Sequence, residues 1–259
     1  MKNDVADAEA ICEAVARPNM RFVPVKSVEQ QAVLSLHRVR QGFVKARTSQ
    51  ANQIRSLLGE FGLVMPQGIM NVRKRVPEVV ENASAELPAA FRHLMNRMLN
   101  HLKELDRQVG ELEAQIKTWH RSSELSQKLE KIPGIGPLGA SALVASIADA
   151  RSFDNGRQVS AWIGVVPRQH SSGGKPTLLG ISKRGDVYLR TLLIHGARSA
   201  IVAAQRKATV NPWLAGLLHR RNPNVAAVAL ANKNARTAWA LLAHDREFQP
   251  DYVPIRATA

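Results

Sequence analysis

The sequence has one cysteine, few aromatic residues and no long apolar run, and each shortage excludes a class of protein. Cys12 is the single thiol in 259 residues, so an internal disulfide and a zinc site of paired thiolates are both excluded. We therefore expect a reducing, cytoplasmic location. No stretch approaches the roughly 18 apolar residues of a membrane span, and Met1–Asp4 contains no signal core, so we expect no membrane partner.

Acidic residues are also few relative to basic ones. The chain has 36 Lys and Arg against 21 Asp and Glu, a net charge of +15. The excess is concentrated in residues 151–221, where 12 basic residues accompany two acids, Asp154 and Asp186. A surface of one sign is typical of a protein that neutralises phosphates, so we expect this segment to face a nucleic acid.

A seven-residue apolar repeat between Phe91 and Trp119 predicts a long helix with a narrow apolar seam. One track of the repeat is Met95, Leu102, Val109 and Ile116, and the other is Phe91, Met98, Leu105, Leu112 and Trp119. A second long helix is predicted over residues 28–61, where Gly59 and Gly62 act as stop signals. Two interpretations of the seam stay open: pairing with a second copy, or antiparallel pairing with the 28–61 helix of the same chain.

The 28–61 helix has a basic flank that contains Arg38, Arg40, Lys45, Arg47 and Arg55. A charge run of this kind is commonly a solvated surface. In a chain of +15 it is equally a candidate surface for a nucleic acid.

The stretch Ile132-Pro133-Gly134-Ile135-Gly136-Pro137 predicts a short hairpin between two helices. Gly134 and Gly136 leave backbone amides unobstructed, so a turn at a helix N-terminus can bind a phosphate oxygen without reading bases. We interpret it as a helix-hairpin-helix that contacts the DNA backbone, with a plain turn as the alternative.

The apolar run Ala161–Pro167 leads into a polar loop, Arg168–Lys175, that contains Ser171 and Ser172. It does not have the pattern of a Walker phosphate loop. Serines beside glycines are commonly a turn, but basic residues gather around these two: Arg168, Lys175, Lys183, Arg184 and Arg190. Phosphoryl transfer needs positioning and charge neutralisation, and a serine nucleophile needs a base, a cation or a metal.

Asp4 and Asp7 lie three residues apart in a stretch that is predicted to be helical. This spacing puts both carboxylates on one face, where they could share a divalent cation. The alternative is that they are acids favoured by the dipole at a helix N-terminus.

Four segments together resemble the insertion-sequence-110 family of transposases, and the last of them, together with VAAVALANKNARTAWALL, resembles its 1111 branch. The segments are KNDVADAEAI, NQIRSLLGEFG, KIPGIGPLGA and AWIGVVPRQHSSGGKPTLLGISKRGDVYLRTLLIHGAR. The resemblance implies an RNase-H-like domain with four acids that bind Mg²⁺, and Asp4 and Asp7 match the last two. It also implies a serine nucleophile that matches Ser172, with Ser171 as the runner-up. The resemblance further implies a guide RNA, held partly by the RNase-H-like domain and its neighbouring basic helix, and oligomers formed through the coiled coil. The RNA contacts expected on that helix are Arg38, Arg40, Lys45, Arg47 and Arg55.

The resemblance implies a mainly α fold in three parts. Residues 1–66 would be the remnant of the RNase-H-like α/β domain with the basic helix, 67–126 a coiled-coil helix, and 127–259 a C-terminal domain with the helix-hairpin-helix, the serine loop and a short β element. No strands bearing the first two acids precede Asp4, so we expect a truncated copy with a weak metal site. The expected function is RNA-guided DNA strand exchange, and the alternatives are an inactive DNA-binding or RNA-binding protein.

Overall fold

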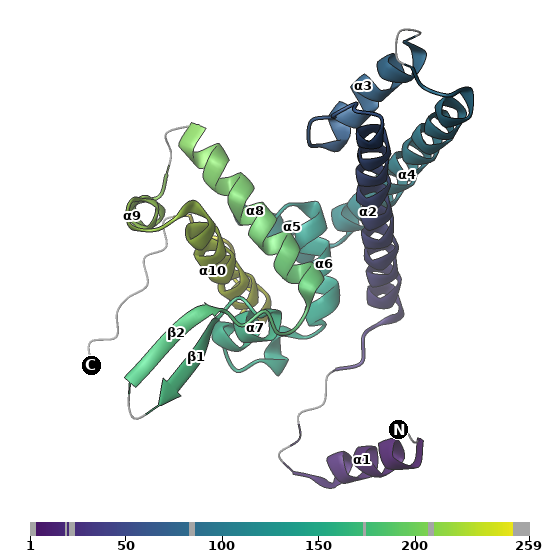
Figure 1. Cartoon of the computed structure of the whole chain (residues 1–259). Helices are drawn as coiled ribbons and strands as arrows, with labels where there is room; N and C mark the ends of the chain where they lie inside the picture. The colour runs from purple at the N-terminus through teal and green to yellow at the C-terminus, as the bar shows by residue number, and fades with distance from the viewer. Residues whose placement is uncertain are drawn as a thin grey trace.

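The computed structural model describes residues 4–18, 20, 24–82, 86–172, 175–206 and 210–250. In these ranges the chain is mainly helical, with one two-stranded antiparallel sheet (Figure 1). The elements are α1 (Asp4–Ala16), α2 (Val28–Glu60), α3 (Ile69–Glu81), α4 (Ala89–Ser122), α5 (Glu124–Glu130), α6 (Pro137–Ile147), the 3₁₀ turn η1 (Ala150–Ser152), α7 (Gly156–Ile163), β1 (Pro167–Ser172), β2 (Lys175–Ile181), α8 (Val187–Arg206), α9 (Pro212–Arg220) and α10 (Pro223–Ala243). None of the described helices is long and apolar enough to cross a membrane.

The two long helices, α2 and α4, pack side by side within the chain and form an arm (Figure 1). The two helices run antiparallel. Trp119 near the end of α4 contacts Glu29 near the start of α2, whereas Met98 nearer the start of α4 contacts Gln50 nearer the end of α2. The heptad seam of α4 therefore pairs antiparallel with α2 of the same chain and not with a second copy. Ser27 and Gln30 form a reciprocal capping box that starts α2 where the apolar pattern begins.

The arm has its own apolar core near its tip, where α3 closes over both long helices. Its members are Ala51, Ile54, Leu58, Met65, Val72, Val76, Val80, Met95, Met98, Leu99 and Leu102. Ile54, Val76 and Met95, one from each helix, are fully buried. Since complete burial of side chains this large contributes about 1.5–3 kcal/mol each, this core is what holds the arm together.

The remaining helices, α5 to α10, surround a second core that forms the body of the molecule. Helix α10 lies against α7 and α8, and its contact face is made mainly of alanines, Ala227, Ala231, Ala235 and Ala238, all at 0% exposure. Small side chains let helix backbones approach closely, so the alanine-rich sequence of α10 is explained by packing. α10 begins at Pro223, with Asn222 as its N-cap.

Helix α1 lies apart from the arm and the body (Figure 1). None of its residues is buried, and Val5, Ile11 and Val15 are all more than 60% exposed. Where residues 1–66 are described, they form α1 and α2 and no strand.

Candidate nucleic-acid interface

The serine doublet lies at the far end of a β-hairpin that projects from the body (Figure 1). The sequence predicts a polar loop here, whereas β1 pairs with β2 so that Ser171 is opposite Pro176 and Ser172 is opposite Lys175. Residues 177–180 of β2 are all exposed, so successive side chains on both faces of this strand meet solvent. The side chains of Ser171, Ser172 and Lys175 lie outside the described part of the chain.

Two glycines interlock where the hairpin joins the body. Gly164 ends α7 at φ +80°, and a Cβ there would lie 1.9 Å from the carbonyl oxygen of Arg184. Gly185 has the same φ, and a Cβ there would lie 1.7 Å from the carbonyl oxygen of Trp162. Because both the left-handed backbone and the close approach require glycine, the chain entering the hairpin is fixed against the chain leaving it.

Arg190, which the sequence places among the candidate DNA contacts, lies inside this junction at 8% exposure. Its Nη1 donates to the carbonyl oxygen of Ile163 at 2.9 Å and to that of Arg184 at 3.1 Å. Arg190 projects from the first turn of α8 and meets both ends of the hairpin segment. This placement takes its guanidinium away from the solvent-facing cations.

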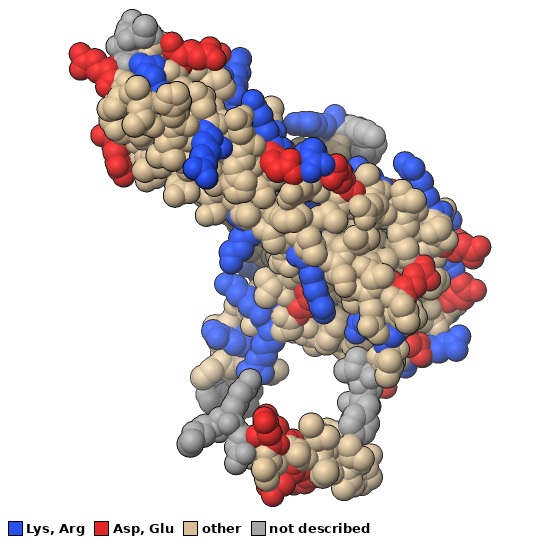
Figure 2. Space-filling model, turned by 90° about the vertical axis from the view of Figure 1, so that its right-hand side faces the viewer, with Lys and Arg blue, Asp and Glu red and all other residues tan. Residues whose placement is uncertain are grey.

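Arg168, Lys183 and Arg184 are exposed around the base of the hairpin. The two acids of the basic segment belong to helix starts: Asp186 accepts from the amide of Leu189, and Asp154 from the side-chain amide of Gln158. Figure 2 shows Lys and Arg gathered along the left edge below the arm, while acidic side chains cluster on α1 at the bottom. Each acid of the basic segment therefore accepts a hydrogen bond within its own helix start.

The turn between α5 and α6 uses its two glycines differently. Gly134, at φ +93°, approaches α8 so closely that a Cβ would lie 2.8 Å from the carbonyl oxygen of Gly196. The buried Asn234 donates to the carbonyl oxygen of Pro133 at 2.8 Å, which ties the same turn to α10. Gly136 is exposed and begins α6 as its N-cap, and a Cβ there would have no described neighbour within 4 Å. Open space for a phosphate is thus at Gly136, while Gly134 serves helix packing.

The basic flank of α2 is divided between internal and free cations. Arg40 pairs with Glu113 through two hydrogen bonds of 2.9 and 2.6 Å, and Arg47 contacts Asp106, so both tie α2 to α4. Arg55 donates to the carbonyl oxygen of Met65.

Arg38 and Lys45 are exposed on the same helix and have no hydrogen-bond or ion-pair partner among the described residues. Of the five predicted RNA contacts, these two have their charges available to a ligand.

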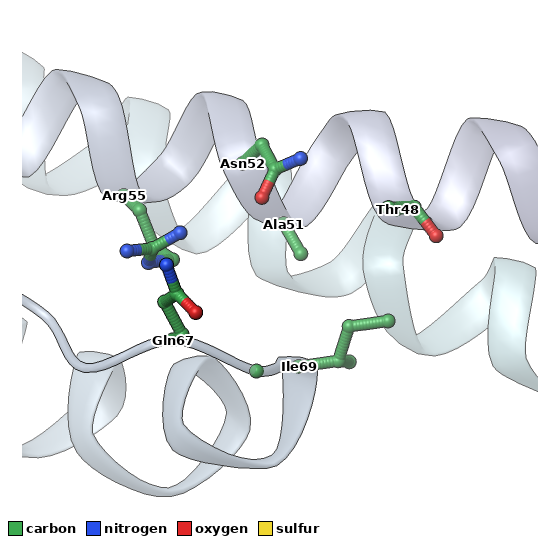
Figure 3. Close-up of a pocket in the computed structure, with 7 residues that line it drawn as sticks. Thr48, Ala51, Asn52, Arg55, Gln67 and Ile69 are labelled. Carbon is green, nitrogen blue, oxygen red and sulfur yellow. The ribbon is translucent and has the colours of Figure 1, made fainter. Parts of the chain in front are cut away.

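A pocket of about 280 Å³ lies between α2 and the start of α3. The side chains of Arg55 and Gln67 point toward one another at one end, and Ala51 and Ile69 line the apolar part (Figure 3). Arg55 is the one charged residue in this lining, so the pocket offers no acid–base pair.

Asp4 and Asp7 both lie in the first turn of α1 and are exposed. No group of three or more metal-ligating side chains occurs in the ranges that the structure describes. Mg²⁺ is commonly held by one or two carboxylates with phosphate oxygens and water, so this pair fits part of a ligand set. In Figure 1, α1 lies away from the hairpin, so the pair does not join the serines in one site.

His37 joins the arm to the body and is missed by sequence reasoning. It is 1% exposed; its Nδ1 lies 2.9 Å from the hydroxyl of Tyr188 on α8, and its Nε2 lies 3.0 Å from the hydroxyl of Ser141 on α6. Ser141 already donates to the carbonyl oxygen of Pro137 at 2.7 Å, so it accepts from Nε2 and Tyr188 donates to Nδ1. Burial, followed by the nearby Arg40 charge, lowers the pKa of His37 to about 4. The imidazole is therefore a neutral structural link.

Comparison with known proteins places this arrangement in a group of mobile-element proteins. The IS116/IS110/IS902 transposase family matches residues 126–211, and a DEDD transposase family of IS110 matches residues 1–62. A protein named "Probable family 20 transposase" from Pseudomonas aeruginosa is 51% identical over 251 residues, which cover 96% of this chain and 74% of that protein.

Two further relatives carry the names of insertion sequences. The transposase for insertion sequence element IS1111A of Coxiella burnetii is 44% identical over 96% of this chain and 68% of its own length. The transposase for insertion sequence element IS1328 of Yersinia enterocolitica is 44% identical over 92% of this chain and 71% of its own length. The chain therefore belongs to the IS110/IS116/IS902 family of insertion-sequence transposases.

Proposed function

We propose that this transposase chain binds DNA with the cations around the hairpin base and transfers DNA strands through a phosphoserine ester at the hairpin tip. The observation that carries the proposal is the position of Ser171 and Ser172 at the far end of a projecting hairpin. Exposed Arg168, Lys183 and Arg184 surround its base. In this proposal a DNA backbone bound at the base extends along the hairpin to the doublet at its tip.

The proposed chemistry conserves the energy of the phosphodiester. The hydroxyl oxygen of Ser172, or of Ser171, attacks phosphorus and gives its proton to a base or to water. The bond from phosphorus to the leaving sugar oxygen breaks, and that oxygen takes up a proton. A hydroxyl from a second DNA end then reverses the step and joins the new strand. Lys175, whose backbone pairs with that of Ser172, is the cation proposed to stabilise the extra negative charge on the pentavalent phosphorus.

Mg²⁺, a guide RNA and self-association complete the proposal on the strength of the family. Mg²⁺ would neutralise charge on DNA phosphates, and Asp4 and Asp7, which lie away from the serines in this structure, are the carboxylates proposed to hold it. Arg38 and Lys45 are the proposed RNA contacts, since their charges have no partner among the described residues. Homo-oligomers would use a surface other than the α4 seam, because α2 fills that seam within the chain.

The decisive experiment traps the covalent intermediate. A labelled duplex from the end of the element, with a bridging phosphorothiolate at the exchange position, releases a thiolate that rejoins poorly, so a serine ester should accumulate as a protein–DNA adduct on a denaturing gel. Ser172→Ala should abolish the adduct and leave duplex binding unchanged. Ser199→Ala, an exposed serine on α8, is the matched control and should form the adduct normally.

The variants separate the competing assignments. Loss of the adduct in Ser171→Ala alone would move the nucleophile by one residue, and an adduct that survives both substitutions together would refute the serine mechanism. DNA binding that weakens by about three decades between 50 and 200 mM salt, without any adduct, would leave a non-catalytic nucleic-acid binder as the function.

A further inference from the structure

We infer that Arg190 is a positioning residue for the serine hairpin. Its buried guanidinium ties the end of α7 to the loop before α8, and so fixes the direction in which the hairpin tip stands. The catalytic consequence of this inference rests on the proposed function, whereas the clamp itself is a property of the fold.

The position of the two acceptors supports the inference. Ile163 is the last residue of α7, four residues before β1 begins, and Arg184 lies three residues after β2 ends. One nitrogen of Arg190 donates to both of their carbonyl oxygens, at 2.9 and 3.1 Å. A single side chain therefore bridges the entry and the exit of the hairpin segment. Hydrogen bonds from a charged donor to carbonyl oxygens are about twice as strong as neutral ones.

Backbone contacts at the same place make the clamp a small rigid unit. The amide of Lys183 donates to the carbonyl oxygen of Gly164 at 3.1 Å, and the amide of Ser182 donates to that of Val166 at 2.8 Å. Asn232 on α10 donates to the carbonyl oxygen of Val165 at 3.2 Å. These bonds continue the sheet from β1 and β2 down to the interlocked glycines.

The hairpin depends on its base because the strands have little other support. β1 and β2 pair with each other, and no described helix packs broadly against either of them. A projecting lever of this kind converts a small rotation at its base into a larger displacement at its tip. Since a misplacement of about 1 Å at a reacting group can cost roughly a hundredfold in rate, the base is where the serine's position is set.

Burial distinguishes Arg190 from its basic neighbours. Arg184 and Lys183 are exposed, whereas Arg190 is 8% exposed and bonds to backbone. A buried cation is costly unless its donors are satisfied. Arginine suits this place better than lysine because its guanidinium is less strongly hydrated than an ammonium group, and the two hydrogens of the planar Nη1 have fixed directions toward the two acceptors. Direct phosphate contact would need the guanidinium at the surface.

Amide hydrogen exchange tests the clamp without reference to catalysis. In Arg190→Met, exchange of the Ser182 and Lys183 amides should rise by about tenfold or more, while the amides of Ala231 and Ala235 in the α10 core keep their protection. Arg190→Lys, the second variant, should show a smaller rise at the same two amides. Exchange that rises equally through α8 and α10 in both variants would overturn the inference, since Arg190 would then be a general core residue.

The adduct assay tests the consequence for the serine. At saturating DNA, Arg190→Met should lower the rate of adduct formation by about 10- to 100-fold while the duplex Kd stays within about threefold, and Arg190→Lys should recover part of the rate. Arg184→Gln, at an exposed cation, should instead raise Kd and leave exchange at Ser182 unchanged. A Kd raised in Arg190→Met as in Arg184→Gln, with normal exchange, would make Arg190 a phosphate ligand and refute the clamp. No adduct in the unaltered chain would refute the proposed function alone.

Discussion

The neutral His37 should make the stability of this protein fall as the pH falls from 6.5 toward 4. The folded pKa of His37 is about 4 because burial and the Arg40 charge disfavour the imidazolium, whereas an unfolded chain has the ordinary value of 6.5. Between these values the unfolded state binds a proton that the folded state does not. The contribution of His37 is therefore complete above pH 6.5 and is lost as the pH falls through 4.

The magnitude follows from the difference between the two pKa values. At about 1.36 kcal/mol per pKa unit, going from pH 7 to pH 5 should remove about 2 kcal/mol, and the whole range to below pH 4 about 3 kcal/mol. A protonated imidazole would also need acceptors on both nitrogens. The hydroxyl of Tyr188 would have to rotate so that its hydrogen points elsewhere and its oxygen accepts from Nδ1.

Urea unfolding of the unaltered chain and of His37→Gln, at pH 7 and pH 5, measures this term. Glutamine keeps hydrogen-bonding groups but does not titrate, so carboxylates common to both proteins cancel in the comparison. We expect the unaltered chain to lose about 2 kcal/mol more than the variant between the two pH values. An equal loss in both proteins would refute the neutral link, because His37 would then titrate alike in the folded and unfolded chain.

Three further predictions concern the junction, the arm and the cationic surface. Gly164→Ala should cost more than about 3 kcal/mol in urea unfolding because its Cβ meets a carbonyl at 1.9 Å, whereas Gly42→Ala, in open space on α2, should stabilise by up to about 1 kcal/mol. Similar effects of the two would contradict the interlock. Glu113→Gln should cost about 1–2 kcal/mol, because a half-buried guanidinium loses its counter-charge; no change in melting would show that the pair is solvated. Arg184→Gln should lower the slope of log Kd against log salt by about 1. Arg55→Gln should not change this slope, because the Arg55 guanidinium bonds to a backbone carbonyl; equal slopes in the two variants would contradict the division into free and internal cations.

Local patterns predicted the helices well, because the forces that start, stop and pair helices are readable over a few turns. The helix predicted over residues 28–61 is α2, Val28–Glu60, and the stop signals Gly59 and Gly62 lie at its end. The heptad repeat predicted α4 and its seam, but a seam has the same sequence whichever helix fills it. The internal partner is decided by contacts across the arm, whose tip α3 closes over both long helices.

Contacts between residues far apart in the chain could not be predicted in this way. His37 meets Ser141 and Tyr188 across 104 and 151 residues, and nothing in the local pattern of α2 distinguishes it from a surface histidine. Gly134 shows the same limit: the motif indicates a free backbone for phosphate, but the fold uses it for close approach to Gly196. A glycine in the sequence indicates that another group approaches the backbone closely, but it does not identify that group.

The basic residues illustrate how burial changes the meaning of charge. A count of cations treats Arg190 and Arg184 alike, since they are six residues apart in the same basic segment. In the fold, α8 turns one of them inward onto two carbonyls and leaves the other at the surface. An exposed cation releases counterions when it meets a phosphate and so affects affinity and its salt dependence. A buried one cannot do so, and under the proposed function Arg190 would act on DNA only through the position of the strands that it holds. Affinity and strand transfer should therefore be separable by substitution in this protein, even within one short basic segment.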